Sequence, residues 1–331
     1  MDRHFGHMLN VFITVDTEFY PLWPDWASAG LSRDIDRDIY GITSRGPFGV
    51  LYQLEILAKY GLKASFFVEG LFACATGDEP MRRIVDEIQE RGQEVQLHLH
   101  PEWLQWMDKP LFESRQRETI DEFSAGEQNQ LIAVAKENLV KAGATNISAF
   151  RAGDFAANAQ TLEALAANQI AYDTSYNACY PKSLKDVSPL ADALGPRQVS
   201  NLWEFPVTWW QDTLGNRRHA QLCSCSSAEL CGALLTAWAA GWHSFVIVSH
   251  SFELLKKRRK RVSKPAPDPL VVRRFDHLSR FLQQNSDKFQ TCHFADIKPD
   301  SIPPLQADKP LGSPAYRTAW RVLEQTYRRL S

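Results

Sequence analysis

The sequence predicts an α/β fold in which short parallel strands curl into a barrel and helices cover its outside. Two observations carry this prediction: β-rich apolar runs recur along the chain, and amphipathic helical stretches separate them. Alternating strands and helices favour parallel strands that are joined by right-handed crossovers. Seven or eight such units within 331 residues fit an irregular (β/α)7-type barrel rather than an open sheet. In such a barrel, the C-terminal ends of the strands converge on one site.

Each predicted strand is a short run rich in β-branched and aromatic residues. In chain order these runs are Val11–Asp16, Ala64–Val68, Glu94–His100, Ser148–Arg151, Ala171–Thr174, Leu202–Val207, Ser244–His250 and a weaker one at Thr291–Ile297. Between them, apolar residues recur at helical spacing at 50–58, 131–139, 162–166 and 230–238. Gly61, Gly143 and Gly241 are expected to end three of these helices.

The barrel is expected to occupy residues 1–300, and the tail 301–331 is expected to end in a helix that packs on its exterior. Two segments within the barrel break the alternating pattern. Residues 20–47 are rich in Pro, Trp, Asp and Arg and predict a long loop near the site. Residues 256–270 begin with a run of six basic residues and continue with three prolines. This second segment predicts a solvated loop, with phosphate recognition as the alternative.

Composition narrows the class of protein. Hydrophobic residues make up 44% and charged residues 23%, which is typical of a globular chain. The net charge of −2 gives no electrostatic case for nucleic acid or an anionic membrane as the main partner. No apolar run approaches the roughly eighteen residues that span a bilayer, and the first apolar run ends at Asp16. Six cysteines in a chain with an ample core favour a reducing, cytoplasmic location. The oligomeric state is left open.

Two carboxylates stand at the end of the first predicted strand. Asp16 and Glu18 are two residues apart, so in an extended chain their side chains share one face. Adjacent carboxylates either repel, which raises one pKa, or share a cation. A solvated strand end is the alternative interpretation of this pair.

The third predicted strand ends in two histidines that also share a face, His98 and His100. This spacing suits the chelation of one metal ion, and Pro101 could turn the chain so that Glu102 approaches the same ion. Two histidines and a carboxylate from another strand provide three protein ligands and leave a position for water. Which of Asp16, Glu18, His100 and Glu102 complete the site beside His98 stays open.

Taken in order, these segments resemble the polysaccharide deacetylases with the nodulation-protein homology domain, a carbohydrate esterase family 4-like group. The resemblance covers about residues 11–297 and identifies the chain as a divergent member. It implies an irregular (β/α)7-type barrel. The family's first motif is an Asp–Asp pair: Asp16 takes the position of the general base, Thr17 stands where the metal-binding Asp would be, and Glu18 is the substitute. Its second motif is H-x3-H, where His98 matches the first position and Glu102 falls on the second.

The resemblance also implies roles for later segments. Arg151 matches the arginine that orients the catalytic Asp, and His250 matches the general acid, with Asp173 as a candidate partner for its imidazole. The stretch 203–210 resembles the aromatic wall of the acyl pocket. Asp154, which follows the fourth strand, is a candidate substrate ligand. The tryptophans that could stack on sugar rings, with core packing as the alternative, are Trp103, Trp209 and Trp210.

The function that follows from the resemblance is a metal-dependent hydrolase of non-peptide C–N bonds, with one divalent ion, expected to be Zn²⁺. It would remove an N- or O-acyl group, acetyl or formyl, from a sugar or glycan of bacterial surface polysaccharide biosynthesis. One alternative is a hydrolase of cyclic or linear amides of purine-breakdown type. Another is a catalytically inactive carbohydrate-binding scaffold, which the absent second Asp and second His would favour.

Overall fold

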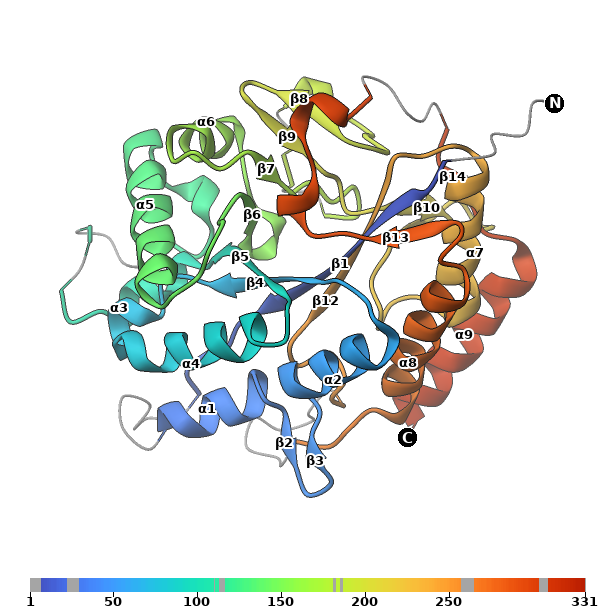
Figure 1. The fold of residues 1–331 in the computed structure, drawn as a ribbon, viewed down its shortest axis with the longest axis horizontal. Coiled ribbons are helices and arrows are strands. Elements are labelled where there is room, and N and C mark those ends of the chain that lie inside the picture. Colours follow the sequence, from blue (N-terminus) through green and yellow to red (C-terminus); the bar gives the residue numbers. More distant parts are fainter. Residues whose placement is uncertain are drawn as a thin grey trace.

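A curled sheet of parallel strands forms the centre of the molecule (Figure 1). The computed structural model describes residues 7–22, 30–109, 111–112, 117–180, 183–184, 187–256, 265–303 and 309–330. Its parallel strands are β1 (Leu9–Thr17), β4 (Ser65–Glu69), β5 (Glu94–Leu99), β6 (Ala149–Ala152), β7 (Tyr172–Asp173), β9 (Leu202–Glu204) and β12 (Ser244–His250). They lie in the order β12-β1-β4-β5-β6-β7-β9, and β8 (Arg197–Val199) adds an antiparallel edge. The predicted fold class is therefore confirmed.

Strand β1 lies at the heart of this sheet. One of its edges pairs with β12 from Asn10 to Asp16. Its other edge pairs first with β13 (Phe289–Thr291) and then, further along, with β4. The outer edge of β12 is covered by irregular chain, since the amide of Thr208 donates to the carbonyl of Val246 and the amide of Val248 to that of Ala220. The sheet is thus curled into an incomplete barrel.

Helices lie outside the curled sheet (Figure 1). They are α1 (Leu31–Asp38), α2 (Val50–Tyr60), α3 (Ala73–Thr76), α4 (Asp78–Gln89), α5 (Ala125–Lys141), α6 (Ala159–Ala167), α7 (Ser227–Ala239), α8 (Pro269–Gln284) and α9 (Ala315–Leu330). Short 3₁₀ turns span Pro101–Trp106, Ile120–Glu122, Gly153–Phe155, Ser188–Leu190, Phe294–Asp296 and Pro299–Ser301. Local sequence sets several boundaries: capping boxes start α5 at Ser124 and α7 at Ser226, and Gly61 ends α2 in the left-handed region (φ 65°). No helix in the described part of the chain is both long and apolar enough to cross a membrane.

Aromatic side chains fill the inside of the curled sheet beneath the strand ends. Phe12 stacks on Phe294 with ring centroids 4.6 Å apart and meets Phe205 edge-on at 5.3 Å. Phe67 belongs to the same buried cluster. Because side chains two residues apart share a strand face, Phe12 and Asp16 lie on the same side of β1. This apolar cluster therefore lies directly beneath the polar residues at the strand ends.

Some elements differ from the sequence prediction. Residues 20–47 are not one long loop, because they contain α1 and a hairpin of β2 (Ile42–Thr43) and β3 (Gly46–Pro47), while 23–29 lie outside the described residues. The last predicted strand is shifted: β13 ends at Thr291. A small sheet of β10 (Trp209–Gln211), β11 (Arg217–His219) and β14 (Leu311–Gly312) was not predicted. Most of the basic run, 257–261, also lies outside the described residues.

Candidate active site

Strand register brings the polar residues of five strands to one edge of the sheet. Asp16 on β1 pairs with His250 on β12. On the other side of β1, Glu69 on β4 pairs with His98 on β5, and His98 in turn pairs with Arg151 on β6. All of these positions lie at the C-terminal ends of parallel strands, where such barrels place their sites.

Asp16 is held by a buried arginine. The Nη1 of Arg151 donates to Oδ1 of Asp16 over 2.6 Å, and the side chains are 0% and 4% exposed. The same guanidinium donates to the carbonyl and the hydroxyl of Thr174, each over 3.2 Å, and lies 4.7 Å from the ring centre of Phe67. Because every side of Arg151 is contacted, the carboxylate of Asp16 is fixed in one orientation. Its second oxygen, Oδ2, faces His250 at 3.9 Å.

His250 is a partly buried imidazole at the mouth of the site. Its Nδ1 donates to Oε2 of Glu253 over 3.1 Å, and that oxygen also accepts from the amide of Gln221 over 3.2 Å. Burial alone would lower the pKa of His250, but the hydrogen bond to Glu253 and the negative charges of Asp16 and Glu18 raise it to about 9. The imidazole is therefore protonated at neutral pH, with Nε2 directed toward Asp16.

The partner of this imidazole differs from the sequence prediction. Asp173, which we expected to contact His250, instead accepts a hydrogen bond from the hydroxyl of Ser175 over 2.6 Å and shares one with the carboxyl of Glu204. Burial raises the pKa of Asp173, and burial together with Asp173 raises that of Glu204 well above its ordinary value. Asp173 Oδ2 and Glu204 Oε2 have no other partner among the described residues, so a shared proton satisfies both. The sequence signal for the true partner is local, since Glu253 follows His250 by three residues.

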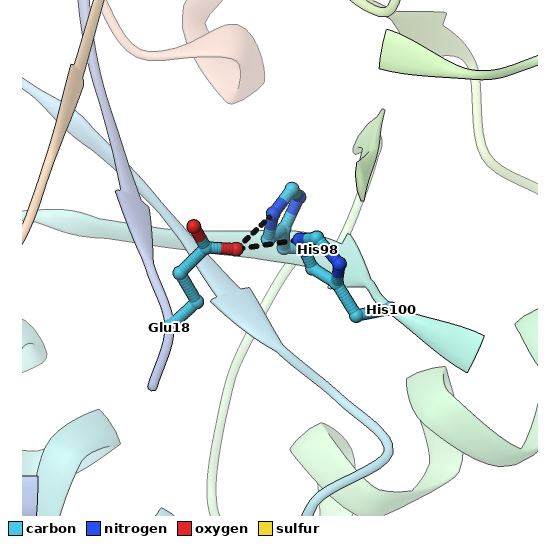
Figure 2. Close-up of side chains that lie close together, drawn as sticks. All are labelled: Glu18, His98 and His100. Carbon is cyan, nitrogen blue, oxygen red and sulfur yellow. Dashed lines mark hydrogen bonds and ion pairs between the residues drawn. The ribbon is translucent and has the colours of Figure 1, made fainter. Parts of the chain in front are cut away.

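Glu18, His98 and His100 form a compact cluster on the other side of Asp16 (Figure 2). One ligand atom from each of them lies within 4.8 Å of the others. Oε2 of Glu18 is 3.0 Å from Nε2 of His98 and 2.6 Å from Nε2 of His100. Burial opposes charge on both groups, but the attraction between Glu18 and His100 outweighs it. The pKa of Glu18 is held well below its usual range and that of His100 well above.

The outer nitrogens of the two histidines show that this cluster suits a cation. Nδ1 of His98 lies 2.7 Å from the backbone carbonyl of Arg151, and because a carbonyl only accepts, this nitrogen donates. In the neutral form of the ring, Nε2 would then present a lone pair to the carboxylate of Glu18, an arrangement that requires a proton or a cation between them. Nδ1 of His100 lies 3.2 Å from Glu102. Metal-binding histidines commonly direct their second nitrogen to a carbonyl or carboxylate in this way.

Glu102 thus supports the cluster from outside it. We expected the turn at Pro101 to bring Glu102 to the ion. Instead, Pro101 begins a 3₁₀ turn, Pro101–Trp106, and the carboxylate of Glu102 contacts Nδ1 of His100, the ring nitrogen that faces away from Glu18. A second supporting acid, Glu69, was not predicted. Its carboxylate accepts from the backbone amides of His100 at 3.2 Å and Phe72 at 2.7 Å, and burial raises its pKa to about 7. Glu69 and Glu102 therefore fix the backbone and the ring of His100.

Gly153 allows His100 to lie where it does. A Cβ on Gly153 would be 2.6 Å from Cε1 and Nδ1 of the His100 ring, which is closer than real atoms approach. We therefore expect Gly153→Ala to push the ring away from Glu18 and to weaken divalent-cation binding by about 10- to 100-fold, the range seen when supporting contacts of a metal site are lost. Isothermal titration with Zn²⁺ measures this.

Gly126→Ala on α5 is the matched control, because a Cβ there meets nothing within 4 Å. Unchanged affinity in Gly153→Ala would show that the ring of His100 takes no part in cation binding.

Two cavities border the site and share Asp38 and Phe252 in their walls. The first, of about 320 Å³, is lined by Glu18, His100, Glu102 and Tyr20, among others. The second, of about 510 Å³, contains His250 and Glu253 and extends past Tyr180 to Lys256 and Arg328. Since α1 contributes Asp38 to both walls, the end of this helix lies beside the site.

The three tryptophans predicted to bind sugar are core residues. Trp103, Trp209 and Trp210 are only 2%, 3% and 1% exposed. Trp103 packs edge-on against Phe19 at 5.0 Å, and Trp210 pairs with Leu311 of β14 in the small sheet. Trp209 and Trp210 lie outside the walls of both cavities, whereas Trp103, although almost fully buried, contributes to the wall of the first. Phe19, Tyr20, Phe252 and Tyr180 also border the cavities, and Tyr20 and Tyr180 are each 38% exposed.

Asp154 is exposed and adopts a left-handed conformation (φ 52°) directly after Gly153. The residues that line the two cavities do not include it. Substrate binding by Asp154 stays a prediction.

Comparison with known proteins places the fold. Neither the protein-family models nor the curated proteins gave a match. Among solved structures, the chain is similar to a protein from Mycobacterium smegmatis described as a "putative polysaccharide deacetylase", with a TM-score of 0.56 and 20% identity over 94% of this chain and 97% of that one. It is also similar to a 4-alpha-glucanotransferase from Thermococcus litoralis (TM-score 0.51, 11% identity, 92% of this chain and 41% of that one).

A further match is a family 4 carbohydrate esterase from Streptomyces lividans in complex with acetate, at a TM-score of 0.43 and 12% identity over 92% of this chain and 98% of that one. At these identities the two matches with TM-scores above 0.5 show the fold alone. The resemblance to polysaccharide deacetylases that the sequence predicts is thus confirmed as a likeness of fold.

Proposed function

We propose that this protein is a metal-dependent hydrolase that removes an N- or O-acyl group, acetyl or formyl, from a sugar or glycan of bacterial surface polysaccharide biosynthesis. One observation carries the proposal: Asp16, fixed by the buried Arg151, lies on β1 between His250 on β12 and the cluster of Glu18, His98 and His100. A base, an acid and a candidate cation site at one strand edge are the groups that acyl hydrolysis requires.

The donor set favours zinc. Two imidazole nitrogens and one carboxylate are a recurrent ligand set of catalytic Zn²⁺, and three protein ligands leave a position open. A divalent ion bound by Glu18, His98 and His100 would supply a Lewis acid that polarises the acyl carbonyl and activates water. His98 and His100 suit this task because Arg151 and Glu102 hold their outer nitrogens.

Asp16 is the proposed general base. With Oδ1 taken by Arg151, Oδ2 is the oxygen left to accept a proton from the attacking water. His250 is the proposed general acid, because its raised pKa keeps it protonated at neutral pH. Its Nε2 can pass that proton to the departing amine or hydroxyl, while Glu253 holds Nδ1 and stabilises the imidazolium. Acid and base thus stand side by side on neighbouring strands.

Phe252 and Tyr180 are the aromatic side chains that we propose to contact the sugar. The ring of Phe252 lies 5.2 Å from that of His250, and Tyr180 stacks on His219 at 5.7 Å within the same cavity. A cytoplasmic location is part of the proposal. It is supported by the six cysteines, which are all free.

The test is a screen of acylated substrates. The purified, zinc-loaded protein should release acetate or formate from at least one N- or O-acylated sugar nucleotide, lipid-linked sugar or oligosaccharide, as measured by an enzyme-coupled acetate or formate assay. The His250→Ala variant should release none above background. Turnover of ring amides with no release from any acylated sugar would instead favour the purine-breakdown type of hydrolase.

The pH profile of kcat/KM tests the acid, because kcat/KM reports the pKa values of the free enzyme. Activity should be present below about pH 9 and should fall as pH rises through that value, because His250 must be protonated. Glu253→Gln removes the negative charge that raises the pKa of His250, so the alkaline limb should move to lower pH. Glu55→Gln, an exposed carboxylate on α2, is the control. An alkaline limb that stays in place in Glu253→Gln would show that His250 is not the titrating acid.

A further inference from the structure

Helix α9 packs on the protein through its polar face, whereas a surface helix usually buries its apolar face. Its face toward the protein is polar: Arg321, 3% exposed, donates to Glu229 at 3.0 Å and to Asp212 at 3.2 Å, and Thr318 is also buried. A further ion pair joins Arg274 of α8 to Glu324 at 2.6 Å. Since buried charges must be paired, these contacts fix which face of the helix is turned inward.

The opposite face of α9 is apolar and open to solvent. The large side chains that are about half to two thirds exposed on this helix are Tyr316, Trp320, Val322, Leu323 and Tyr327, at 66%, 56%, 49%, 64% and 65%. The positions 316, 320, 323 and 327 follow helical spacing, so they form one stripe roughly 16 Å long. Figure 1 shows α9 on the outside of the molecule, beside α7 and α8. A continuous apolar patch of this kind marks a contact surface.

Positive charge flanks this stripe. A groove of about 610 Å³ separates α9 from α8, and Arg273, His277 and Arg280 line it together with Trp320 and Tyr327. Arg273 and Arg280 are exposed. The two acidic residues of the groove are already neutralised: Glu324 pairs with Arg274, and Asp276 pairs with both Lys59 and Arg280. Three arginines thus face two acids in the groove, so the face combines aromatic side chains with a small excess of positive charge, although the whole chain carries a net charge of −2.

We propose that this face, formed by the stripe of α9 and the arginines of α8, docks on a membrane surface rich in anionic phospholipid. Tyr and Trp with an apolar body and a polar end suit the interfacial region of a bilayer, and flanking arginines bind headgroup phosphates. A second copy of the chain fits less well. A two-fold interface would set this positively charged face against the same face of a second copy, and the described acids of the groove are already paired.

The inward face of α9 reaches the candidate active site. Arg328, on the last turn of α9, lines the same cavity as His250. The inference does not depend on the proposed hydrolysis, because lipid binding is measured without a substrate.

The test is sedimentation of the full-length protein with vesicles of phosphatidylcholine alone or with 30% phosphatidylglycerol, a composition that makes the surface anionic. The protein should bind the anionic vesicles, and binding should weaken as salt screens the headgroups. Trp320→Ser with Leu323→Ser should weaken binding by at least roughly tenfold, because the two apolar side chains no longer insert. Arg273→Glu with Arg280→Glu should remove the preference for anionic lipid, again by roughly tenfold or more.

Leu214→Ser is the matched control, since Leu214 is 80% exposed but lies in the turn between β10 and β11. All five substituted side chains are exposed, and thermal unfolding is used to check that each variant is folded. The proposal would be overturned if the wild-type protein did not bind anionic vesicles, or if the variants bound them with wild-type affinity. A concentration-dependent dimer that Trp320→Ser dissociates, without vesicle binding, would assign the face to a second copy instead.

Discussion

Asp16→Asn should lower kcat by about 10²- to 10⁴-fold, the usual contribution of a general base, while the protein keeps its divalent cation. Asparagine can still accept the hydrogen bond from Arg151 through its side-chain oxygen, but it cannot take a proton from water. The cation cluster of Glu18, His98 and His100 does not include Asp16, so the metal content should stay near one ion per chain. Rates of acetate or formate release and metal analysis of the same sample measure both effects.

Stability must be separated from catalysis in this variant. Arg151 is fully buried, and removing its counter-charge can destabilise the fold by about 3–5 kcal/mol. The rate is therefore compared well below the unfolding temperature, with Asp287→Asn, an exposed carboxylate, as the control. His250→Ala gives an independent check, because this side chain is 22% exposed and its loss leaves Asp16 paired with Arg151. Wild-type turnover in either variant would contradict the proposed division of acid and base.

Glu18→Gln should abolish stoichiometric binding of the divalent cation. The carboxylate of Glu18 is the group that both Nε2 atoms face, at 3.0 and 2.6 Å, and an amide is a much weaker ligand. Glu102→Gln is the isosteric comparison: Glu102 touches only the outer nitrogen of His100, so its loss should weaken binding by about 10- to 100-fold without abolishing it. Elemental analysis and calorimetric titration with Zn²⁺ separate the two outcomes. Full occupancy in Glu18→Gln would assign the carboxylate ligand to another residue.

The sequence predicts the core of the sheet and of the site because both depend on local spacing. The alternation of apolar runs located β1, β4, β5, β6 and β12, and the spacing of the carboxylates and histidines predicted that each pair shares a face. The choice among Asp16, Glu18, His100 and Glu102 required the structure, since it depends on strand register and on the turn after β5. The partner of His250 was missed because a resemblance pointed to Asp173, although Glu253 stands three residues beyond the imidazole.

Burial of particular side chains was harder to predict. Trp209 and Trp210 are covered within a sheet whose third strand, β14, lies about a hundred residues later in the chain. The apolar spacing of α9 predicts an amphipathic helix, but ion pairs from Arg321 to Asp212 and Glu229 decide which face is turned inward. Such distant pairings leave no local signal in the sequence.

The most direct test of the account is a crystal structure of protein never exposed to chelator, with anomalous scattering measured at the zinc edge. We expect one strong peak per chain, in contact with the carboxylate of Glu18 and the Nε2 atoms of His98 and His100. No peak at this cluster, or a peak held by Asp16 or Glu102 in place of Glu18, would contradict the account.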